Sequence, residues 1–119
     1  FPAFWSRSSG LAAPLRMDTP DQIARAARIR AGMGLPGGQL VANPIPEKDE
    51  IAAETLAPVI AAALAAADRA GIAAKEVTPF LLDHIFHATD GASLTANIAL
   101  VMNNARLAAQ IAQAFASTA

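Results

Sequence analysis

The side chains of this sequence that could do chemistry include two histidines and three asparagines on expected helices. His84 and His87 stand three residues apart, so both imidazole rings can face one side of a helix and ligate a metal ion. A structural zinc site needs about four ligands, and neither a carboxylate nor a cysteine stands at a suitable spacing to complete such a set. The sequence therefore disfavours a metal site at these histidines.

The asparagines follow one another on the last expected helix. Asn97 and Asn104 are seven residues apart, so they share one line on the helix and lie roughly 10 Å from one another, while Asn103 points elsewhere. Asparagine is a poor residue for the middle of a helix, and burying its amide without hydrogen-bond partners is costly. Two alternatives follow for Asn97: a neighbouring backbone satisfies its amide, or the helix presents it to a ligand.

Two further polar groups have a structural and a functional interpretation. The residues Ser6 to Gly10 form a polar loop, which is either a cradle for an anion or a surface turn, and the turn chemistry of Ser and Gly favours the turn. Four acidic residues lie just before, or in the first turn of, the long helix expected from about residue 53. Their carboxylates can serve a metal or acid-base chemistry, but acids also favour a helix N-terminus, which is the preferred interpretation; the group comprises Glu47, Asp49, Glu50 and Glu54.

A glycine-rich stretch from Gly32 to Gly37 matches the pattern G-x-G-x-x-G. That pattern binds a dinucleotide when it follows a strand and opens a helix, because the phosphates then meet the helix N-terminus. Here the expected order is helix, glycines, strand. The glycines are therefore interpreted as the end of one element and the turn into the next.

Four helices position these side chains. The first is expected over residues 20–31, with Thr19 as cap, Pro20 at the first helical position and Gln22 completing a capping box. The second is expected over residues 53–70 and closed by Gly71. The third starts at a Thr78 cap with Pro79 in its first turn and ends at Asp90 and Gly91, and the fourth runs from a Ser93 cap to about Phe115.

The fourth helix carries an apolar face at helical spacing, which predicts a packing surface. Its members are Leu94, Ile98, Val101, Ala105, Ala108, Ala112 and Phe115.

Two segments are expected to have an extended backbone. Leu40, Val41 and Ala42 form a short apolar run that suits a strand buried on both faces, and it leads into Asn43, held extended by Pro44 in a stiff loop that ends at Pro46. Residues 1–5 are expected to be a strand or an extended segment. Because a lone buried strand leaves its backbone unpaired, the run at residues 40–42 is interpreted as an inner strand of a sheet whose other members lie outside this chain. The expected fold class is therefore mixed α/β, the helix-rich C-terminal part of an α/β/α sandwich, with one or two strands here and the rest of the sheet in an N-terminal part outside this chain.

The composition of the 119 residues also indicates that part of the packing surface lies outside this chain, since 54% are hydrophobic but only 5% are aromatic. Alanine supplies much of the apolar count and buries little area, so these helices need a further surface to pack against. The net charge is −1, which gives no electrostatic basis for binding nucleic acid or an anionic membrane. There is no cysteine, no apolar run long enough to span a bilayer and no recognisable targeting segment. We therefore expect a cytoplasmic location, in a reducing compartment.

Three groups of segments together resemble a known family. They are residues 1–5 with Ser9 and Gly10, residues 37–46 with their Leu-Val-Ala-Asn-Pro-Ile-Pro run, and residues 77–82 with the asparagine-bearing run from Ser93 to Ala108. Their order is similar to that in the C-terminal part of the pseudouridine-5′-phosphate glycosidases, also labelled indigoidine synthase A-like. The resemblance covers essentially all of this chain and somewhat less than half of a family member.

The resemblance implies a mixed α/β fold, a homotrimer, and cleavage of the C–C glycosidic bond of pseudouridine 5′-phosphate to uracil and ribose 5-phosphate with a divalent metal, usually Mn²⁺. It places the family's Schiff-base lysine, proton-donating glutamate and metal-handling aspartate before the region present here. Lys48 and Lys75 are the only lysines of the chain, and neither matches that lysine.

By the same resemblance, Asn97 matches the asparagine that contacts the base, and Asn43 is a second substrate-binding candidate because of its matched loop. The family often has aspartate where this chain has Ser8, so no role is assigned to that loop.

Residues 1–119 are therefore expected to be a single segment, the C-terminal part of a larger glycosidase domain. We expect this segment to supply base recognition but not the covalent step, to hold no metal ligand, and to be inactive without the N-terminal part. The alternative is a non-catalytic, alanine-rich helical module that self-associates.

Overall fold

The computed structural model describes residues 1–117 of the chain. Four α-helices and two short 3-10 helices follow one another within that range. In chain order they are α1 (Pro20–Gly32), η1 (Glu47–Asp49), α2 (Ala53–Arg69), η2 (Ala74–Glu76), α3 (Val77–Ala88) and α4 (Ala92–Ser117).

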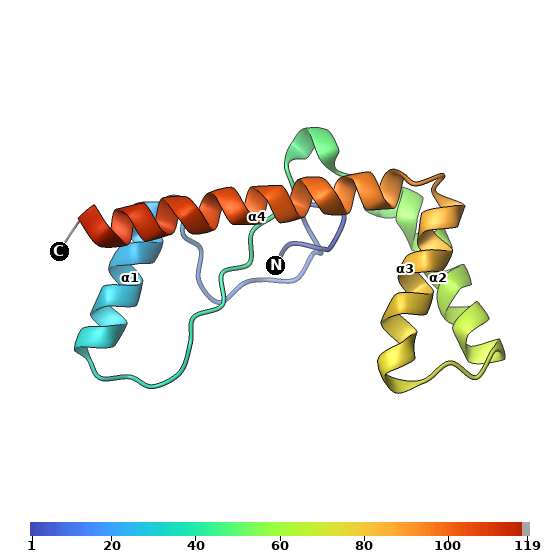
Figure 1. Cartoon of the computed structure of the whole chain (residues 1–119), viewed down its shortest axis with the longest axis horizontal. Coiled ribbons are helices and arrows are strands. Elements are labelled where there is room, and N and C mark those ends of the chain that lie inside the picture. The colour runs from blue at the N-terminus through green and yellow to red at the C-terminus, as the bar shows by residue number, and fades with distance from the viewer. Residues whose placement is uncertain (118–119) are drawn as a thin grey trace.

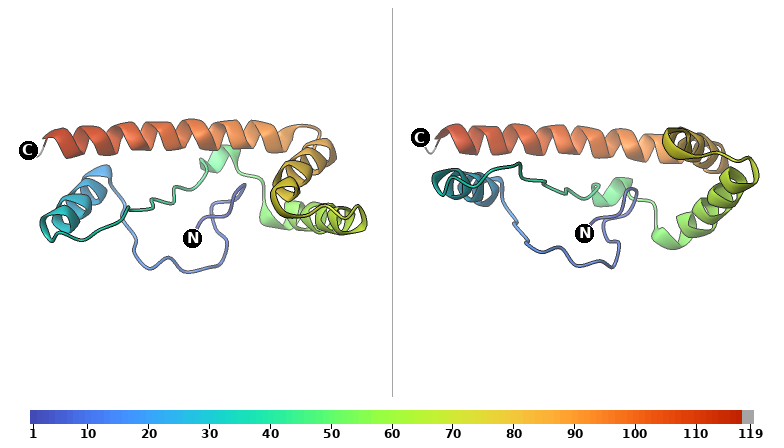
Figure 2. Two further views of the ribbon diagram at one scale, coloured as in Figure 1. Left: turned by 60° about the horizontal axis from the view of Figure 1, so that its bottom comes forward. Right: turned by 90° about the horizontal axis from the view of Figure 1, so that it is seen from below.

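The helices form an open arch beneath one long rod. α4 is the rod, α1 packs under its C-terminal half, and α2 and α3 pack on one another at its N-terminal end (Figure 1). Two irregular segments, the N-terminal one and the chain between α1 and η1, run between these supports (Figure 2). The arch brings residues from the start, middle and end of the chain together along α4.

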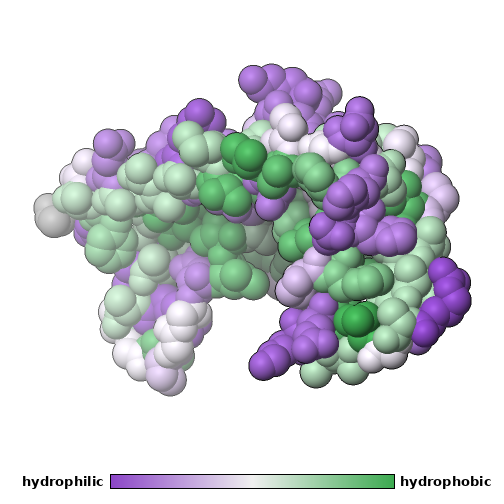
Figure 3. Space-filling model, turned by 45° about the vertical axis from the view of Figure 1, so that its right-hand side comes forward, coloured by the Kyte–Doolittle hydropathy of each residue, from purple (hydrophilic) through white to green (hydrophobic). Residues whose placement is uncertain are grey.

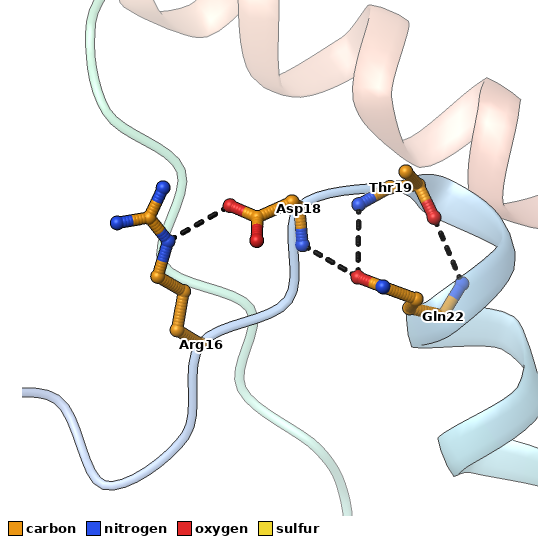
Figure 4. A network of polar contacts seen from close by, with 4 residues as sticks. All are labelled: Arg16, Asp18, Thr19 and Gln22. Atoms are coloured by element: carbon orange, nitrogen blue, oxygen red, sulfur yellow. Dashed lines mark hydrogen bonds and ion pairs between the residues drawn. The ribbon is translucent and has the colours of Figure 1, made fainter.

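The first helix begins as the sequence predicts. Thr19 Oγ1 accepts the backbone N–H of Gln22 at 3.2 Å, and Gln22 Oε1 accepts the N–H of Thr19 at 3.3 Å (Figure 4). The capping box is therefore confirmed, and it satisfies two N–H groups that the helix cannot. Just before it, the exposed Arg16 donates to Asp18 at 2.8 Å, and this hydrogen bond and the carboxylate charge raise the pKa of the Arg16 guanidinium.

The expected caps of α3 and α4 are wrong. α3 begins at Val77, directly after η2, so that Thr78 and Pro79 lie inside its first turn. Ser93 lies inside α4, where it is buried and donates its N–H to Thr89 Oγ1 at 3.2 Å. Thr89, the residue after α3, thus supplies the side-chain cap that the sequence assigned to Ser93.

The strand expected at residues 40–42 is also wrong for this structure. Residues 1–117 contain no strand, and Leu40 is 86% exposed rather than buried. A strand exists by pairing its N–H and C=O groups with a neighbour, and no second extended segment pairs with this one in the described residues. Residues 1–3 have no regular structure and residues 4–7 form bends, with the N–H of Ala3 donating to Ser6 O at 3.0 Å. The helix-rich part of the expected fold class is confirmed, and the strands it expected here are absent from the described residues.

The hydrophobic core lies where the α2/α3 pair meets the N-terminal half of α4. Residues of the N-terminal segment and of the chain before η1 complete it. Its buried members are Trp5, Ile45, Leu56, Ala63, Ile85, Ala96 and Leu100. A second contact, under the other half of α4, buries Ile23 and Ala24 of α1.

The chain is far from a compact shape. Its radius of gyration is 17.6 Å, against about 13.5 Å for a compact domain of this length. Its accessible surface is 8221 Å², about 2,100 Å² more than the roughly 6,100 Å² of a compact monomer of this mass. The composition-based expectation that these helices lack a packing surface agrees with these values.

In the part of the chain that the structure describes, no helix is both long and apolar enough to cross a membrane.

Candidate functional site

A pocket of about 290 Å³ opens between the N-terminal segment, α3 and the start of α4. This volume is at the lower limit of small-molecule sites. Apolar and aromatic side chains dominate the lining, which also carries one carboxylate and one amide: Trp5, Leu82, Asp83, Phe86, Ser93, Leu94 and Asn97.

Trp5 fixes one wall of this pocket. Its indole is buried, and its Nε1 donates to the backbone oxygen of Ser93 at 3.0 Å. A phenyl ring, that of Phe4, packs edge-on against the indole with the ring centroids 4.6 Å apart. Because Ser93 is one helical turn before Asn97, the indole holds the turn of α4 that carries the asparagine.

Asn97 lies at the edge of the covered face of α4. It is half-buried and lines the pocket, with the buried Ala96 on one side of it and the exposed Leu94 and Ile98 on the other. Within residues 1–117 its side-chain amide makes no hydrogen bond to another side chain or to the backbone. No neighbouring backbone group of the described residues satisfies the amide, and its presentation to a ligand stays a prediction.

Asn43 lies in a different place and has a partner. Its Nδ2 donates to Asn104 Oδ1 at 3.0 Å, and Asn103 Nδ2 donates to Pro44 O at 3.1 Å. Asn103 and Asn104 together therefore fasten the loop to α4. The point of attachment is one to two helical turns beyond Asn97, roughly 10 Å along the axis, so the structure does not bring Asn43 and Asn97 into one pocket.

The Ser6 to Gly10 loop is tied to the chain around η1. Ser6 Oγ donates to Ile51 O at 2.8 Å, and the Arg7 guanidinium donates to Ile45 O at 2.7 Å. The backbone N–H of Arg7 also donates to Glu50 Oε2 at 3.1 Å. These bonds agree with a structural turn rather than an anion cradle.

The two histidines have local partners. His84 stacks on Phe80 with the ring centroids 6.1 Å apart, and His87 Nδ1 lies 2.8 Å from the backbone oxygen of Asp83. Residues 1–117 contain no group of three or more His, Cys, Asp or Glu side chains placed to hold a metal ion. Lys48 and Lys75 are both exposed, so neither lies in the desolvated, apolar setting of an activated lysine nucleophile.

Sequence reasoning missed three residues of the pocket: Trp5, Asp83 and Phe86. The last two are three residues apart on α3 and so share a face, which was a usable signal. Trp5 carried no such signal, because its segment was expected to be a strand or an extended segment and its contact with Ser93 joins residues 88 positions apart.

An open helical arch with a half-formed pocket is the structure expected of one part of a larger domain. The comparisons agree, and the chain belongs to the indigoidine synthase A-like family, whose model matches residues 1–114. A protein named pseudouridine-5′-phosphate glycosidase from a Jannaschia species is 64% identical over 114 residues, which are 96% of this chain and 38% of that protein. The protein of the same name from Paracoccus denitrificans is 65% identical over 116 residues, which are 98% of this chain and 38% of that protein.

Solved structures give the same assignment. The prealnumycin C-glycosynthase AlnA in complex with ribulose 5-phosphate matches with a TM-score of 0.80 at 29% identity, over 94% of this chain and 36% of that one. An indigoidine synthase A-like protein from Thermotoga maritima matches with a TM-score of 0.79 at 33% identity, over the same shares of the two chains. This chain therefore spans less than two-fifths of the length of the relatives it matches, and it corresponds to their C-terminal part.

Proposed function

We propose that this chain is the C-terminal portion of a pseudouridine-5′-phosphate glycosidase, which splits the C–C bond of pseudouridine 5′-phosphate into uracil and ribose 5-phosphate. The names of the relatives at 64% and 65% identity support the assignment. The observation on this chain that carries it is the position of Asn97, half-buried in the wall of the pocket.

The pocket suits recognition of a flat base with an amide-like edge. A uracil ring presents alternating N–H and C=O groups, and the Asn97 side chain offers both an acceptor and two donors. Trp5 and Phe86 supply apolar surface beside that amide, as small-molecule sites usually do. In this proposal the chain orients the leaving base and the rest of the enzyme does the covalent chemistry.

The catalytic lysine and the metal belong, in this proposal, to the N-terminal part of the enzyme. The described residues do not fit Mn²⁺, because no cluster of three ligands exists among them, so no step at this site is derived through the metal. A homotrimeric assembly and a cytoplasmic location complete the proposal as expectations from the family resemblance.

The test combines this chain with the N-terminal three-fifths of the relative from Paracoccus denitrificans and measures uracil release from pseudouridine 5′-phosphate in the presence of Mn²⁺. We expect no release by this chain alone and release by the mixture. Asn97→Ala should lower kcat/KM of the mixture by about 5- to 150-fold, since an unmatched buried polar group costs about 1–3 kcal/mol. Gln110→Ala, at an exposed position of α4, is the control and should change little. Turnover by this chain alone, or full activity of the Asn97→Ala mixture, would refute the proposal.

The exposed residues 40–42 acquire a role in the same framework. We propose that they pair with a strand from the N-terminal part and so become an inner strand of its sheet. Their apolar character, the β-branched Val41, and the exposure of Leu40 at 86% and Val41 at 39% support this.

The second candidate, self-association without catalysis, draws support from the alanine-rich open face of α4. It predicts concentration-dependent dimers of this chain alone in analytical ultracentrifugation. A monomer over the full concentration range would remove it.

A further inference from the structure

α4 has two faces, and the chain itself covers one of them. The covered face carries Ser93, Ala96 and Leu100, all buried. The opposite face carries six of the seven residues that the sequence predicted to be a packing surface, and all six are exposed. We call these six the outer stripe: Leu94, Ile98, Val101, Ala105, Ala108 and Ala112.

The outer stripe is long, apolar and uncharged. It extends about 27 Å along the helix axis, at 1.5 Å per residue. Its larger side chains are well exposed: Leu94 at 48%, Ile98 at 57% and Val101 at 57%. Figure 3 shows hydrophobic surface gathered along α4 beside the hollow of the arch. Contiguous apolar surface of this extent marks an interaction site on a soluble protein.

We propose that the outer stripe is the docking surface for the N-terminal part of the enzyme, and that docking closes the Asn97 pocket. This inference rests on the proposed function and adds to it the surface through which the two parts assemble. The occupant follows from the length of the relatives, since 62% of each of the two glycosidases lies outside the match, and this chain corresponds to their C-terminal part.

The excess of exposed surface is large enough for such an occupant to cover. The chain exposes about 2,100 Å² more than a compact monomer of its mass, whereas an ordinary interface between proteins takes about 800 Å² from each partner. The excess is therefore large enough for an extensive interface. The alanines at the C-terminal end of the stripe have small side chains, which permit a second helix or a sheet to approach closely.

The stripe also continues into the pocket. Leu94 belongs to both, and Asn97 lies between the stripe and the covered face of α4. On α3, Leu82 and Phe86 extend the same apolar surface, at 39% and 38% exposure. A partner seated on the stripe would therefore roof the pocket, exclude water from Asn97, and strengthen its hydrogen bonds to a ligand.

The test measures binding rather than activity. This chain, immobilised, is titrated with the N-terminal three-fifths of the Paracoccus denitrificans relative, and Val101→Glu is compared with Gln110→Glu. Both variants add one carboxylate to α4 with a residue that favours helix, but position 110 lies outside the stripe. We expect Val101→Glu to weaken binding at least 10-fold and Gln110→Glu to leave it within about twofold. Circular dichroism checks that both variants keep their helices, and the uncharged Val101→Gln should give an intermediate loss.

Three results would overturn the inference: no binding by the unaltered chain, equal binding by the two glutamate variants, or dimers of this chain alone that Val101→Glu abolishes. The last would assign the stripe to a second copy. A complex that forms through the stripe but releases no uracil would leave the inference standing and count against the proposed function, so the two can fail separately.

Discussion

Gly91 lies in the turn between α3 and α4, the two helices that line the pocket. Its φ is +79° and that of the preceding Asp90 is +49°, so two of the three residues of the turn adopt the left-handed region. Glycine enters that region without steric cost, and other L-residues do so at about 1–2 kcal/mol. A Cβ at position 91 would also lie 3.4 Å from Phe86 Cε2, on a side chain that lines the pocket.

We therefore predict that Gly91→Ala destabilises the chain by about 1–2 kcal/mol, measured as a lower midpoint of urea unfolding by helical circular dichroism. Gly38→Ala is the matched control, because no atom lies within 4 Å of its built Cβ and its φ is not left-handed. That control should be neutral or stabilising by up to about 1 kcal/mol. Equal effects of the two substitutions would show that the turn geometry does not limit stability.

At the residue scale, the sequence singled out Asn97 and Asn43 as substrate-binding candidates, and the structure places them apart. Asn97 stood out because an amide among small apolar residues needs a reason, and the structure puts it in a pocket wall. Asn43 was singled out by its position in a stiff loop, and in the structure its Nδ2 donates a hydrogen bond to Asn104 Oδ1. A side-chain contact between residues 61 positions apart has no periodicity or turn signature, so the pattern of one sequence does not contain it.

At the scale of elements, the helices were predictable and the strand was not. The Thr19 and Gln22 capping box and the Pro20 start are local signals, and α1 follows them. The run at residues 40–42 has strand-like residues as well, but strand formation depends on a partner that the described residues lack. Helices satisfy their own backbone, whereas strands need another segment.

This difference leads to a prediction about residues 40–42. Their backbone amides should exchange with solvent deuterium at nearly unprotected rates in this chain alone, because the segment lies exposed outside any helix. In the complex with the N-terminal part, pairing in a sheet should slow their exchange at least about 10-fold. Hydrogen exchange with mass spectrometry measures both states.

Ala63 provides the internal control, since it is buried in α2 and should be protected in both states. Protection of residues 40–42 in this chain alone would contradict the exposed conformation. Unchanged exchange in a complex shown to form would contradict the proposed strand.

At the scale of the whole molecule, composition anticipated the openness of the arch. Burial of apolar area stabilises by about 25 cal/mol per Å², and alanine-rich helices offer little area each. The seven-residue buried core at one end of α4 is small for 119 residues. The pattern of residues does not distinguish the faces that remain open, because the covered and open faces of α4 are both apolar and both follow helical spacing.

The arch makes a quantitative prediction for the chain in solution. Small-angle X-ray scattering should give a radius of gyration close to the 17.6 Å of the structure, slightly enlarged by hydration, rather than the roughly 13.5 Å of a compact domain. Val101→Glu should give the same value, because it alters the outer stripe without touching the contacts that hold the arch. A radius near the compact value in a monodisperse sample would mean that α1 and the α2/α3 pair close under α4 on their own, and it would contradict the open arch.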